Sequence, residues 1–506
     1  MDETRKAGLR EHLAVAFLFL ASLGFVVALN LTPVHNGDFW IQLTVGDIVR
    51  ETGEIPETFE FTYTEAKDER YVEARWLAGL TWSHLYQIQG YAGMIVVKCL
   101  FVLCMFGLIA LLSHQVGRDP VLAIGLASFT ILGINFRSLM RPGLVAFVLA
   151  LLVLNFLYAF IRTRRPRWLI PLIPLAVVWT NFHPSFVAGF ALPACFAAGE
   201  VVDGLWRWKA SGLKPDWTSI RRSVVWLSVT SFGMLLAALV NPYGVEFFEH
   251  MLNVEASDFI RENVWEWQSL FHPRFRGEPF MFLFITTTLF VVVSGIMGRR
   301  KLRAAPILLV IAFFPLALSA IRHVPWFEIM ASFFLAHTLG HSEFLRRQRV
   351  PIALVLAVVL IAGIGYVVEN GNTRGRKPGF SNDAPLNPAA IEAIREAEIS
   401  GNVFHSYSYG DQLAYHFYPD IRIAMDTRIY PEKYYREFRS MTGGNPRLMV
   451  EPEKLRDYLA RYDVEAIVTE PFNMRVWEAM GHLPILVELG FTGLYQDRDT
   501  VIMRRK

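Results

Sequence analysis

Long apolar runs alternate with short polar stretches from Met1 to about Val368, and they stop beyond about Glu369. A helix that crosses a membrane needs roughly 17–25 mainly apolar residues. The runs therefore predict an α-helical polytopic membrane protein with about eleven transmembrane helices. The candidate segments are 12–33, 91–113, 120–136, 143–161, 168–182, 185–203, 223–240, 279–297, 304–320, 324–340 and 351–368.

Beyond about Pro385 the pattern changes to short helix and strand signals in alternation. The strand signals "NVFHSY", "IRIAMDTR" and "VEAIVTE" are separated by helical ones. This order is typical of an α/β domain with a largely parallel sheet. The end, "LPILVELGFTGLYQDRDTVIMRR", predicts a strand, a turn and a final hairpin. The chain therefore divides into a transmembrane domain at 1–368 and a soluble α/β domain at 369–506.

Basic residues gather in alternate connections between the predicted helices. With the N-terminus in the cytoplasm, the basic loops at 161–167, 207–222, 298–303 and 346–349 all fall on the cytoplasmic side, as the positive-inside rule requires. The opposite side then holds a first outer loop (34–90) and a second outer loop (241–279). Because eleven is odd, it also holds the C-terminal domain.

Composition agrees with a membrane protein and narrows the function. The 506 residues are 53% hydrophobic and 19% charged. A net charge of +3 gives no indication of nucleic-acid binding. The three cysteines lie inside apolar runs and predict no disulfide framework. The cytoplasmic loops contain no glycine-rich phosphate-binding motif, which argues against an enzyme that uses nucleotides inside the cell.

The first outer loop carries two acidic residues of interest. Asp38 precedes apolar residues at helical spacing, among them Ile41 and Val45, which predict an amphipathic helix on the membrane surface. Aspartate is a favoured N-cap, so Asp38 is either the cap of this helix or a reactive carboxylate, and the two roles are compatible. Glu73 precedes a second predicted helix at 76–89 and is either a solvated loop acid or a second site residue.

Cationic and polar side chains recur in the outer turns and in the second outer loop. They are Arg137 and Arg141 in "FRSLMRP", His183 in "WTNFHPSF", Glu266 in "WEW", and Arg322 and His323 in "IRHVPWF". Singly, each arginine can extend toward lipid head groups. Together they predict an outer cavity in which arginines hold a phosphate through paired hydrogen bonds. A histidine at membrane depth is tolerated where it lines such a cavity, and Glu266 between two tryptophans can hold a sugar or an acceptor.

These residues are the ones that a transfer reaction on an anionic lipid needs. A carboxylate would remove the proton of an incoming hydroxyl, and the cations would stabilise the phosphate. The spacing predicts no metal-ligand set. A magnesium or manganese ion between a carboxylate and the phosphate is nevertheless compatible with this chemistry.

Several segments resemble, in order, those of a widespread group of bacterial polytopic membrane proteins. The resemblance rests on "NGDFWIQLTVGDIVRETGEIPETFEFTYT", "WTNFHPSFVAG", "NPYG", and "SYSYGDQLAYHFYPDIRIAMDTRIYP" in the tail. This group is similar to the GT-C glycosyltransferases, the polyprenyl-phosphate-sugar-dependent enzymes of the mannosyl- and aminoarabinose-transferase type. The chain departs from the group's pattern at Gln42, where a histidine is usual, and at Pro184 and Thr427, where glycine is usual.

The resemblance implies a GT-C-like fold and a membrane glycosyltransferase of the bacterial inner membrane. Asp38 would be the catalytic base and Glu73 a second acid. The partners would be a polyprenyl-phosphate-linked sugar, membrane lipids and a lipid, glycan or protein acceptor. Fold alone does not fix the activity. Two other functions remain open: a ligase or polymerase of lipid-linked glycans that uses outer Arg and His, and a non-enzymatic transporter or scaffold.

Overall fold

The computed structural model describes residues 3–34, 36–212, 214–298, 302–382, 384–442 and 451–506. Its contacts divide the chain into two compact units. The helical unit contains Met1–Thr32 and Ile95–Phe380, and the α/β unit contains Pro33–Met94 and Ser381–Lys506. The first outer loop therefore groups with the C-terminal residues.

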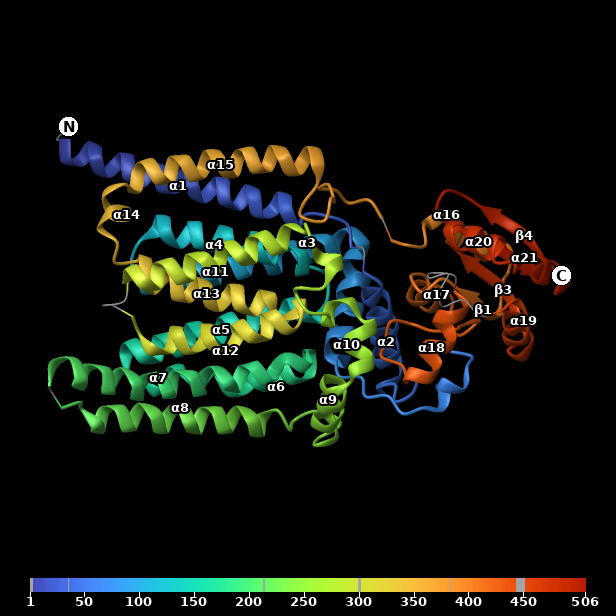
Figure 1. Cartoon of the computed structure of the whole chain (residues 1–506), viewed down its shortest axis with the longest axis horizontal. Helices are drawn as coiled ribbons and strands as arrows, with labels where there is room; N and C mark the ends of the chain where they lie inside the picture. Colours follow the sequence, from blue (N-terminus) through green and yellow to red (C-terminus); the bar gives the residue numbers. More distant parts are fainter. Residues whose placement is uncertain (1–2, 35, 213, 299–301, 383, 443–450) are drawn as a thin grey trace. The chain divides into compact units, whose positions relative to one another are not determined.

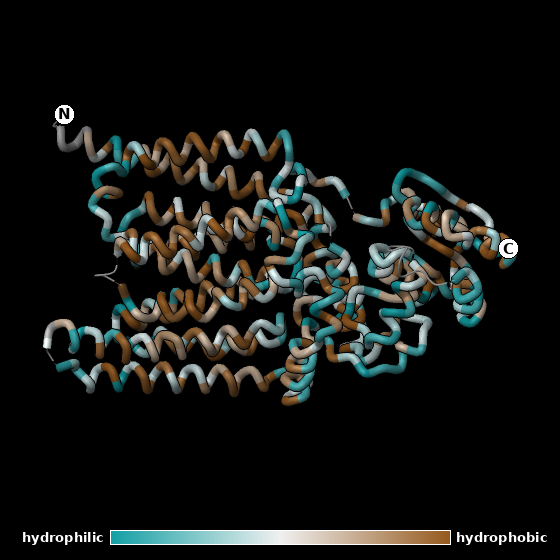
Figure 2. The backbone as a smooth tube through the Cα atoms, viewed as in Figure 1, coloured by the Kyte–Doolittle hydropathy of each residue, from teal (hydrophilic) through white to brown (hydrophobic). Residues whose placement is uncertain are grey.

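The helical unit consists of long apolar helices that lie side by side, hydrophobic along most of their length (Figures 1 and 2). Helix α13 (Val324–Leu339) is buried almost all round and packs against three others, as an element apolar on every face should. The helices that coincide with apolar runs are α1 (Glu3–Asn30), α3 (Trp76–Gly117, its later part), α4 (Pro120–Ile134), α5 (Pro142–Thr163), α6 (Leu172–Phe182), α7 (Val187–Ser211), α8 (Trp217–Ala237), α11 (Pro279–Gly298), α12 (Ala304–Ser319), α13 and α15 (Arg349–Asn370). The connections between them contain α9 (Glu246–Ala256), α10 (Asp258–Asn263) and α14 (Glu343–Arg347).

Each of the eleven predicted spans coincides with one of these helices. Eight helices of the described residues are long and apolar enough to cross a membrane, so the chain is a multi-pass membrane protein. The other three, α6, α12 and α13, have 11, 16 and 16 residues. At 1.5 Å per residue these reach only about 16–24 Å, less than the hydrocarbon thickness of about 30 Å. The count of eleven therefore stays a prediction.

The predicted alternation of the loops is visible within the helical unit. The basic connection between α7 and α8 lies at the same end of the helices as α14, and α9 and α10 of the second outer loop lie at the opposite end (Figure 1). One end of the helices is therefore rich in basic loops, and the other carries the candidate site turns. Which end faces the cytoplasm stays a prediction.

The α/β unit contains a five-stranded sheet in the order β2-β1-β3-β5-β4. Its strands are β1 (Gly401–His405), β2 (Ile421–Ile423), β3 (Val464–Thr469), β4 (Phe491–Gln496) and β5 (Val501–Arg505), and its helices are α16 (Pro388–Glu396), α17 (Gly410–Phe417), α18 (Glu432–Met441), α19 (Pro452–Arg461), α20 (Pro471–Ala479) and α21 (Leu483–Glu488). Strand β1 is parallel to β2 and β3, whereas β5 is antiparallel to β3 and β4. The sheet is therefore mixed, and the expectation of a largely parallel one holds only for its β2-β1-β3 half.

The strand expected at "LPILVE" is wrong, because Leu483–Glu488 forms helix α21. Pro484 sits in the first turn of this helix, where its missing N–H costs nothing. Ile485 and Leu486 are buried, while Val487 is 71% exposed. A short apolar run does not by itself distinguish a strand from one buried helical turn.

The amphipathic helix expected at the membrane surface is α2 (Gly37–Thr52), and its apolar face is covered by protein. Ile41 and Val45 are fully buried in the hydrophobic core of the α/β unit, together with Leu413 of α17 and Ile421 of β2. This apolar face therefore packs on protein and not on lipid, while the place of the helix at the membrane surface stays a prediction. The helical period shows that one face is buried, but it does not show what covers that face.

The rest of the first outer loop also joins this core through the sheet edge. Thr62 forms a parallel bridge with Ile423 of β2. The backbone N–H of Tyr63 donates to Ile423 O at 3.0 Å, and that of Ile423 donates to Phe61 O at 2.9 Å. The second predicted helix, 76–89, is the first part of α3 and ends at a break at Gly90, which has a φ of 62°.

Candidate functional site

In the helical unit, two arginines meet one carboxylate at the ends of neighbouring helices. Arg137 closes the 3-10 turn η2 (Asn135–Arg137), and Arg141 lies just before α5. Both donate to Oε2 of Glu266, from Arg137 Nη1 at 2.7 Å and from Arg141 Nη1 at 2.8 Å. Glu266 belongs to the turn η5 (Trp265–Trp267) of the second outer loop and is 18% exposed.

Arg322 adds a third guanidinium beside this group. It lies in the turn η8 (Ile321–His323), and its Cζ is 3.9 Å from the ring centroid of Trp267. A cation over an indole face is favourable by about 0.5–2 kcal/mol, more when water is excluded. Trp267, the residue after Glu266, thus orients the Arg322 guanidinium group close to the Glu266 carboxylate. We call Arg137, Arg141, Arg322 and Glu266 the arginine cluster.

The net charge of the arginine cluster determines which type of ligand it favours. Burial opposes ionisation of Glu266, but Arg137, Arg141 and Arg322 hold its pKa well below the usual range. Burial lowers the pKa of Arg322, and Glu266 opposes that effect. One carboxylate faces three guanidinium groups, so the cluster carries an excess positive charge. A phosphate is the ligand type that such an excess favours.

The two predicted histidines lie near this group. His183 Nδ1 and Ser185 Oγ are 2.8 Å apart, and a Cβ on Gly143, two residues after Arg141, would be 3.5 Å from His183 Nε2. His323 Nδ1 is 3.2 Å from Leu316 O. Burial and the neighbouring Arg322 lower the pKa of His323 to about 4, so it is neutral at pH 7.

The other predicted residues, Asp38 and Glu73, belong to the α/β unit. Asp38 lies half-buried in the first turn of α2, whose N-cap position is Asn36. The interpretation of Asp38 as the N-cap is therefore wrong by two residues. An acidic residue in the first turn of a helix nevertheless stabilises that helix, by about 0.3–1 kcal/mol.

Glu73 is fully buried rather than a solvated loop acid, and it is bonded to Arg75. The Arg75 backbone N–H donates to Glu73 Oε1 at 3.2 Å, and Arg75 Nε lies 3.6 Å from the same oxygen. Although burial opposes it, Tyr71, Glu73 and Asp38 together raise the pKa of Arg75. Arg75 therefore faces both predicted acids and keeps its charge.

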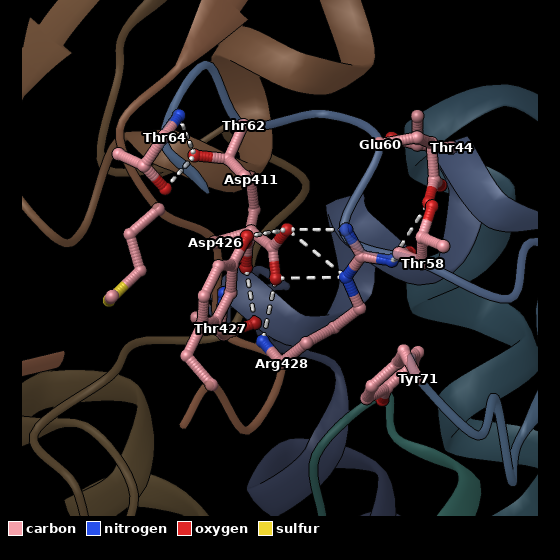
Figure 3. Close-up of polar contacts among 12 residues, drawn as sticks. Thr44, Thr58, Glu60, Thr62, Thr64, Tyr71, Asp411, Asp426, Thr427 and Arg428 are labelled. Atoms are coloured by element: carbon pink, nitrogen blue, oxygen red, sulfur yellow. Dashed lines mark hydrogen bonds and ion pairs between the residues drawn. The ribbon is translucent and has the colours of Figure 1, made fainter. Parts of the chain in front are cut away.

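A second buried charge pair ties the first outer loop to the tail. Arg428 Nη2 donates to Asp426 Oδ2 at 2.8 Å, and its Nη1 donates to Thr58 O at 3.1 Å (Figure 3). Glu60 Oε2 lies 3.5 Å from the same Nη1. Arg428 is buried and fully paired within this network, which indicates a structural role for the "MDTR" segment.

The sequence prediction missed two arginines, Arg75 and Arg374. Arg374 follows α15 and donates to Phe136 O, next to Arg137. Burial lowers its pKa, and so do the positive charges of Arg137 and Arg141. In the sequence both residues stand in ordinary polar stretches, "EARW" and "NTRGRKPG", and only their neighbours in space distinguish them.

No group of three or more His, Cys, Asp or Glu side chains that could hold a metal ion is found in the part of the chain that the structure describes.

No protein-family model matches the sequence, and no curated protein sequence matches it. Solved structures do match over nearly the whole chain. The archaeal oligosaccharyltransferase AglB from Archaeoglobus fulgidus, in complex with an inhibitory peptide and a dolichol-phosphate, is 12% identical, with a TM-score of 0.61 over 98% of this chain and 74% of that one. ArnT from Cupriavidus metallidurans, bound to undecaprenyl phosphate, is 12% identical, with a TM-score of 0.53 over 99% and 98%.

A third similar structure is the arabinofuranosyltransferase AftD from Mycobacteria, at 13% identity and a TM-score of 0.50. The match covers 98% of this chain and 39% of that one. At these identities the likeness concerns the fold alone. The chain has a GT-C-like fold with a soluble α/β part, as the sequence predicts.

Proposed function

We propose that this protein is a membrane glycosyltransferase that transfers a sugar from a polyprenyl-phosphate donor to an acceptor on the extracytoplasmic face of the bacterial inner membrane. The acceptor is a lipid, a glycan or a protein. The observation that carries the proposal is the arginine cluster, an excess of guanidinium groups at one end of the membrane helices. The fold supports it, since similar structures hold dolichol-phosphate and undecaprenyl phosphate.

The arginine cluster has the chemistry that a phosphate leaving group needs. When the bond between the sugar anomeric carbon and the phosphate oxygen breaks, the electron pair stays on that oxygen and the phosphate gains charge. Guanidinium groups held in place beforehand stabilise this charge more than they stabilise the donor. Glu266 orients Arg137 and Arg141 through its hydrogen bonds with them. Its negative charge repels the phosphate, but the positive charges of the three arginines outweigh that repulsion.

Asp38 is the proposed base. It removes the proton of the acceptor hydroxyl as the oxygen attacks the anomeric carbon from the side opposite the phosphate, so the configuration inverts. The positive charge of Arg75 faces Asp38, and Glu73 holds Arg75 in place. Glu73 thus acts through Arg75. A magnesium or manganese ion at the phosphate stays a prediction from the sequence.

The test measures release of free polyprenyl phosphate by purified full-length protein from a panel of undecaprenyl-phosphate-linked sugars, in detergent with a lipid extract as acceptor. Loss of a general base typically lowers the rate about 10²–10⁴-fold, so we expect Asp38→Asn to lower kcat by that factor. Loss of one hydrogen bond to a charged group costs about 1.5–3 kcal/mol. Arg322→Ala is therefore expected to weaken binding of undecaprenyl phosphate by about 10–100-fold.

Two matched controls separate these effects from general damage. Asp68→Asn removes an exposed carboxylate from the same loop as Asp38, and Arg276→Ala removes an exposed cation from the second outer loop. Both should keep the wild-type rate. If Asp38→Asn retains full turnover while Arg322→Ala abolishes it, the lipid-linked glycan ligase or polymerase becomes the better assignment. Binding of undecaprenyl phosphate without any turnover would favour the scaffold.

A further inference from the structure

Asp411 of α17 is a buried carboxyl group that the proposed reaction does not use. It is 1% exposed. Its Oδ1 accepts from Thr427 N at 2.8 Å, and its Oδ2 lies 2.7 Å from Thr427 Oγ1. Neighbouring Asp426 is paired with Arg428, but no Lys, Arg or His among the described residues forms an ion pair with Asp411. A buried carboxylate without a cation is costly, whereas the neutral acid is not.

This carboxyl group touches the helical turn that carries Asp38. Helices α2 and α17 pack against each other. A Cβ placed on Gly37, the first residue of α2, would lie only 2.7 Å from Asp411 Oδ2. The backbone of α2 therefore rests directly on the carboxyl group, one residue before Asp38. Glycine is required here by this close approach.

The charges around Asp411 favour its neutral form. Burial first, and then the negative charges of Asp426 and Asp38, raise the pKa of Asp411 to about 8. The hydrogen bonds from Thr427 act in the opposite direction. Tyr407 also faces this group, and burial raises its pKa well above the usual range, so it adds no charge near neutral pH.

We propose that Asp411 is a positioning residue for Asp38: its neutral carboxyl group supports the first turn of α2, and its ionisation releases that turn. Below the pH at which Asp411 ionises, the two carboxyl groups together carry one negative charge, on Asp38. Above it, two negative charges face each other across the contact with Gly37, and their repulsion separates α17 from α2. The statement about Asp38 as a base rests on the proposed function, but the contact between the two helices does not.

The first test needs no enzymatic activity. Between about pH 4 and about pH 8, Asp411 is protonated in the folded state and ionised in the unfolded state. The stability that this group contributes is therefore complete at the acidic end of this interval and is lost as pH rises through about 8. The thermal unfolding midpoint of the full chain in detergent should fall over this range. Asp411→Asn should flatten that fall, while the exposed control Asp420→Asn should leave it unchanged.

Two further variants should move the pH of this transition in opposite directions. Asp38→Asn removes a negative charge near Asp411, so the transition should shift to lower pH. Thr427→Val removes a hydroxyl that bonds the carboxylate, so it should shift to higher pH. A shift in the same direction for both would contradict the coupling. Equal pH dependence in Asp411→Asn and wild type would overturn the proposal outright.

The second test measures transfer. Wild-type turnover should decline as pH rises through about 8. Asp411→Asn should show a lower rate at neutral pH, since its support of the turn is imperfect, but without that alkaline decline. Gly37→Ala changes no charge, so it should lower kcat at every pH and keep the decline. If the wild type transfers no sugar at all, the proposed function fails, while the stability test still decides the role of Asp411.

Discussion

Arg428 is enclosed by three aromatic rings and by the carboxylate of Asp426. Its Cζ lies 4.6 Å from the ring centroid of Phe61 and 5.1 Å from those of Phe59 and Tyr71. Taking two charges out of water costs several kcal/mol for each, and the gain from the pair roughly offsets this cost. The pair therefore adds little net stability, but either member alone would be an uncompensated buried charge.

Removal of the cation alone should be strongly destabilising. We expect Arg428→Met to lower the free energy of unfolding by about 3–5 kcal/mol, because Asp426 then stays buried without its partner. The double variant Asp426→Asn with Arg428→Met should recover part of this loss. Thermal or denaturant unfolding of the protein in detergent measures both. A double variant no more stable than Arg428→Met would contradict this explanation.

At the scale of the element, α2 shows how one helix serves two purposes. Its apolar face, with Ile41 and Val45, packs in the core of the α/β unit, and its first turn presents Asp38. A rigid helix fixes a side chain more narrowly than a free loop does. The packing of α2 against α17 is therefore part of what would hold the base in place.

The burial of the apolar face of α2 can be tested by shortening one of the side chains on that face. Removal of a buried isoleucine side chain typically costs about 2–5 kcal/mol, so Ile41→Ala should lower the unfolding midpoint clearly. A helix lying on lipid would instead show weaker membrane binding and little change in stability. The control is Ile88→Ala in α3, because Ile88 is 79% exposed. Equal effects of the two substitutions would contradict the packing of α2.

At the scale of the whole molecule, the α/β unit is assembled from two stretches of chain that are far apart in sequence. Pro33–Met94 supplies α2 and the loop that carries Glu73, and Ser381–Lys506 supplies the sheet. Folding of either stretch therefore needs the other, because the apolar face of α2 and the edge of β2 would otherwise be exposed.

This dependence predicts the outcome of a chain cut. A protease site inserted between Phe380 and Ser381 should allow complete cleavage, yet the C-terminal fragment should remain bound during gel filtration in detergent. The double variant Ile41→Ala with Val45→Ala should release that fragment after the cut, since these side chains form the shared core. Release of the fragment from the cut wild type would show that the two stretches fold separately.

Much of the fold could be predicted because it depends on local pattern. The long apolar runs predicted every long helix of the helical unit. The short strand and helix signals of the tail predicted β1, β3, α16 and α19. The prediction for Leu483–Glu488 was wrong because a run of five apolar residues fits either a strand or one buried helical turn. The position of Asp38 in its helix was shifted by two residues, which is the usual uncertainty of helix ends.

The candidate site was only partly predictable. The turns that carry Arg137, Arg141 and Arg322 were found from their place between apolar runs. Glu266 was also predicted as a site residue, but its pairing with Arg137 and Arg141 was not, since it is 129 residues from Arg137 and 125 from Arg141. Pairing across such separations depends on how the helices pack.

The sequence by itself determined that the chain crosses a membrane several times, where its helices lie, and which turns carry charge. These properties follow from the hydrophobicity and spacing of neighbouring residues, because each helix or loop must itself match the lipid or water that surrounds it. Only the tertiary structure decided that the α/β unit covers α2, that Arg75 faces both predicted acids, and that Asp411 lies against Gly37. Those contacts join residues that are far apart in the chain, and both burial and charge pairing depend on which residues are close together in space.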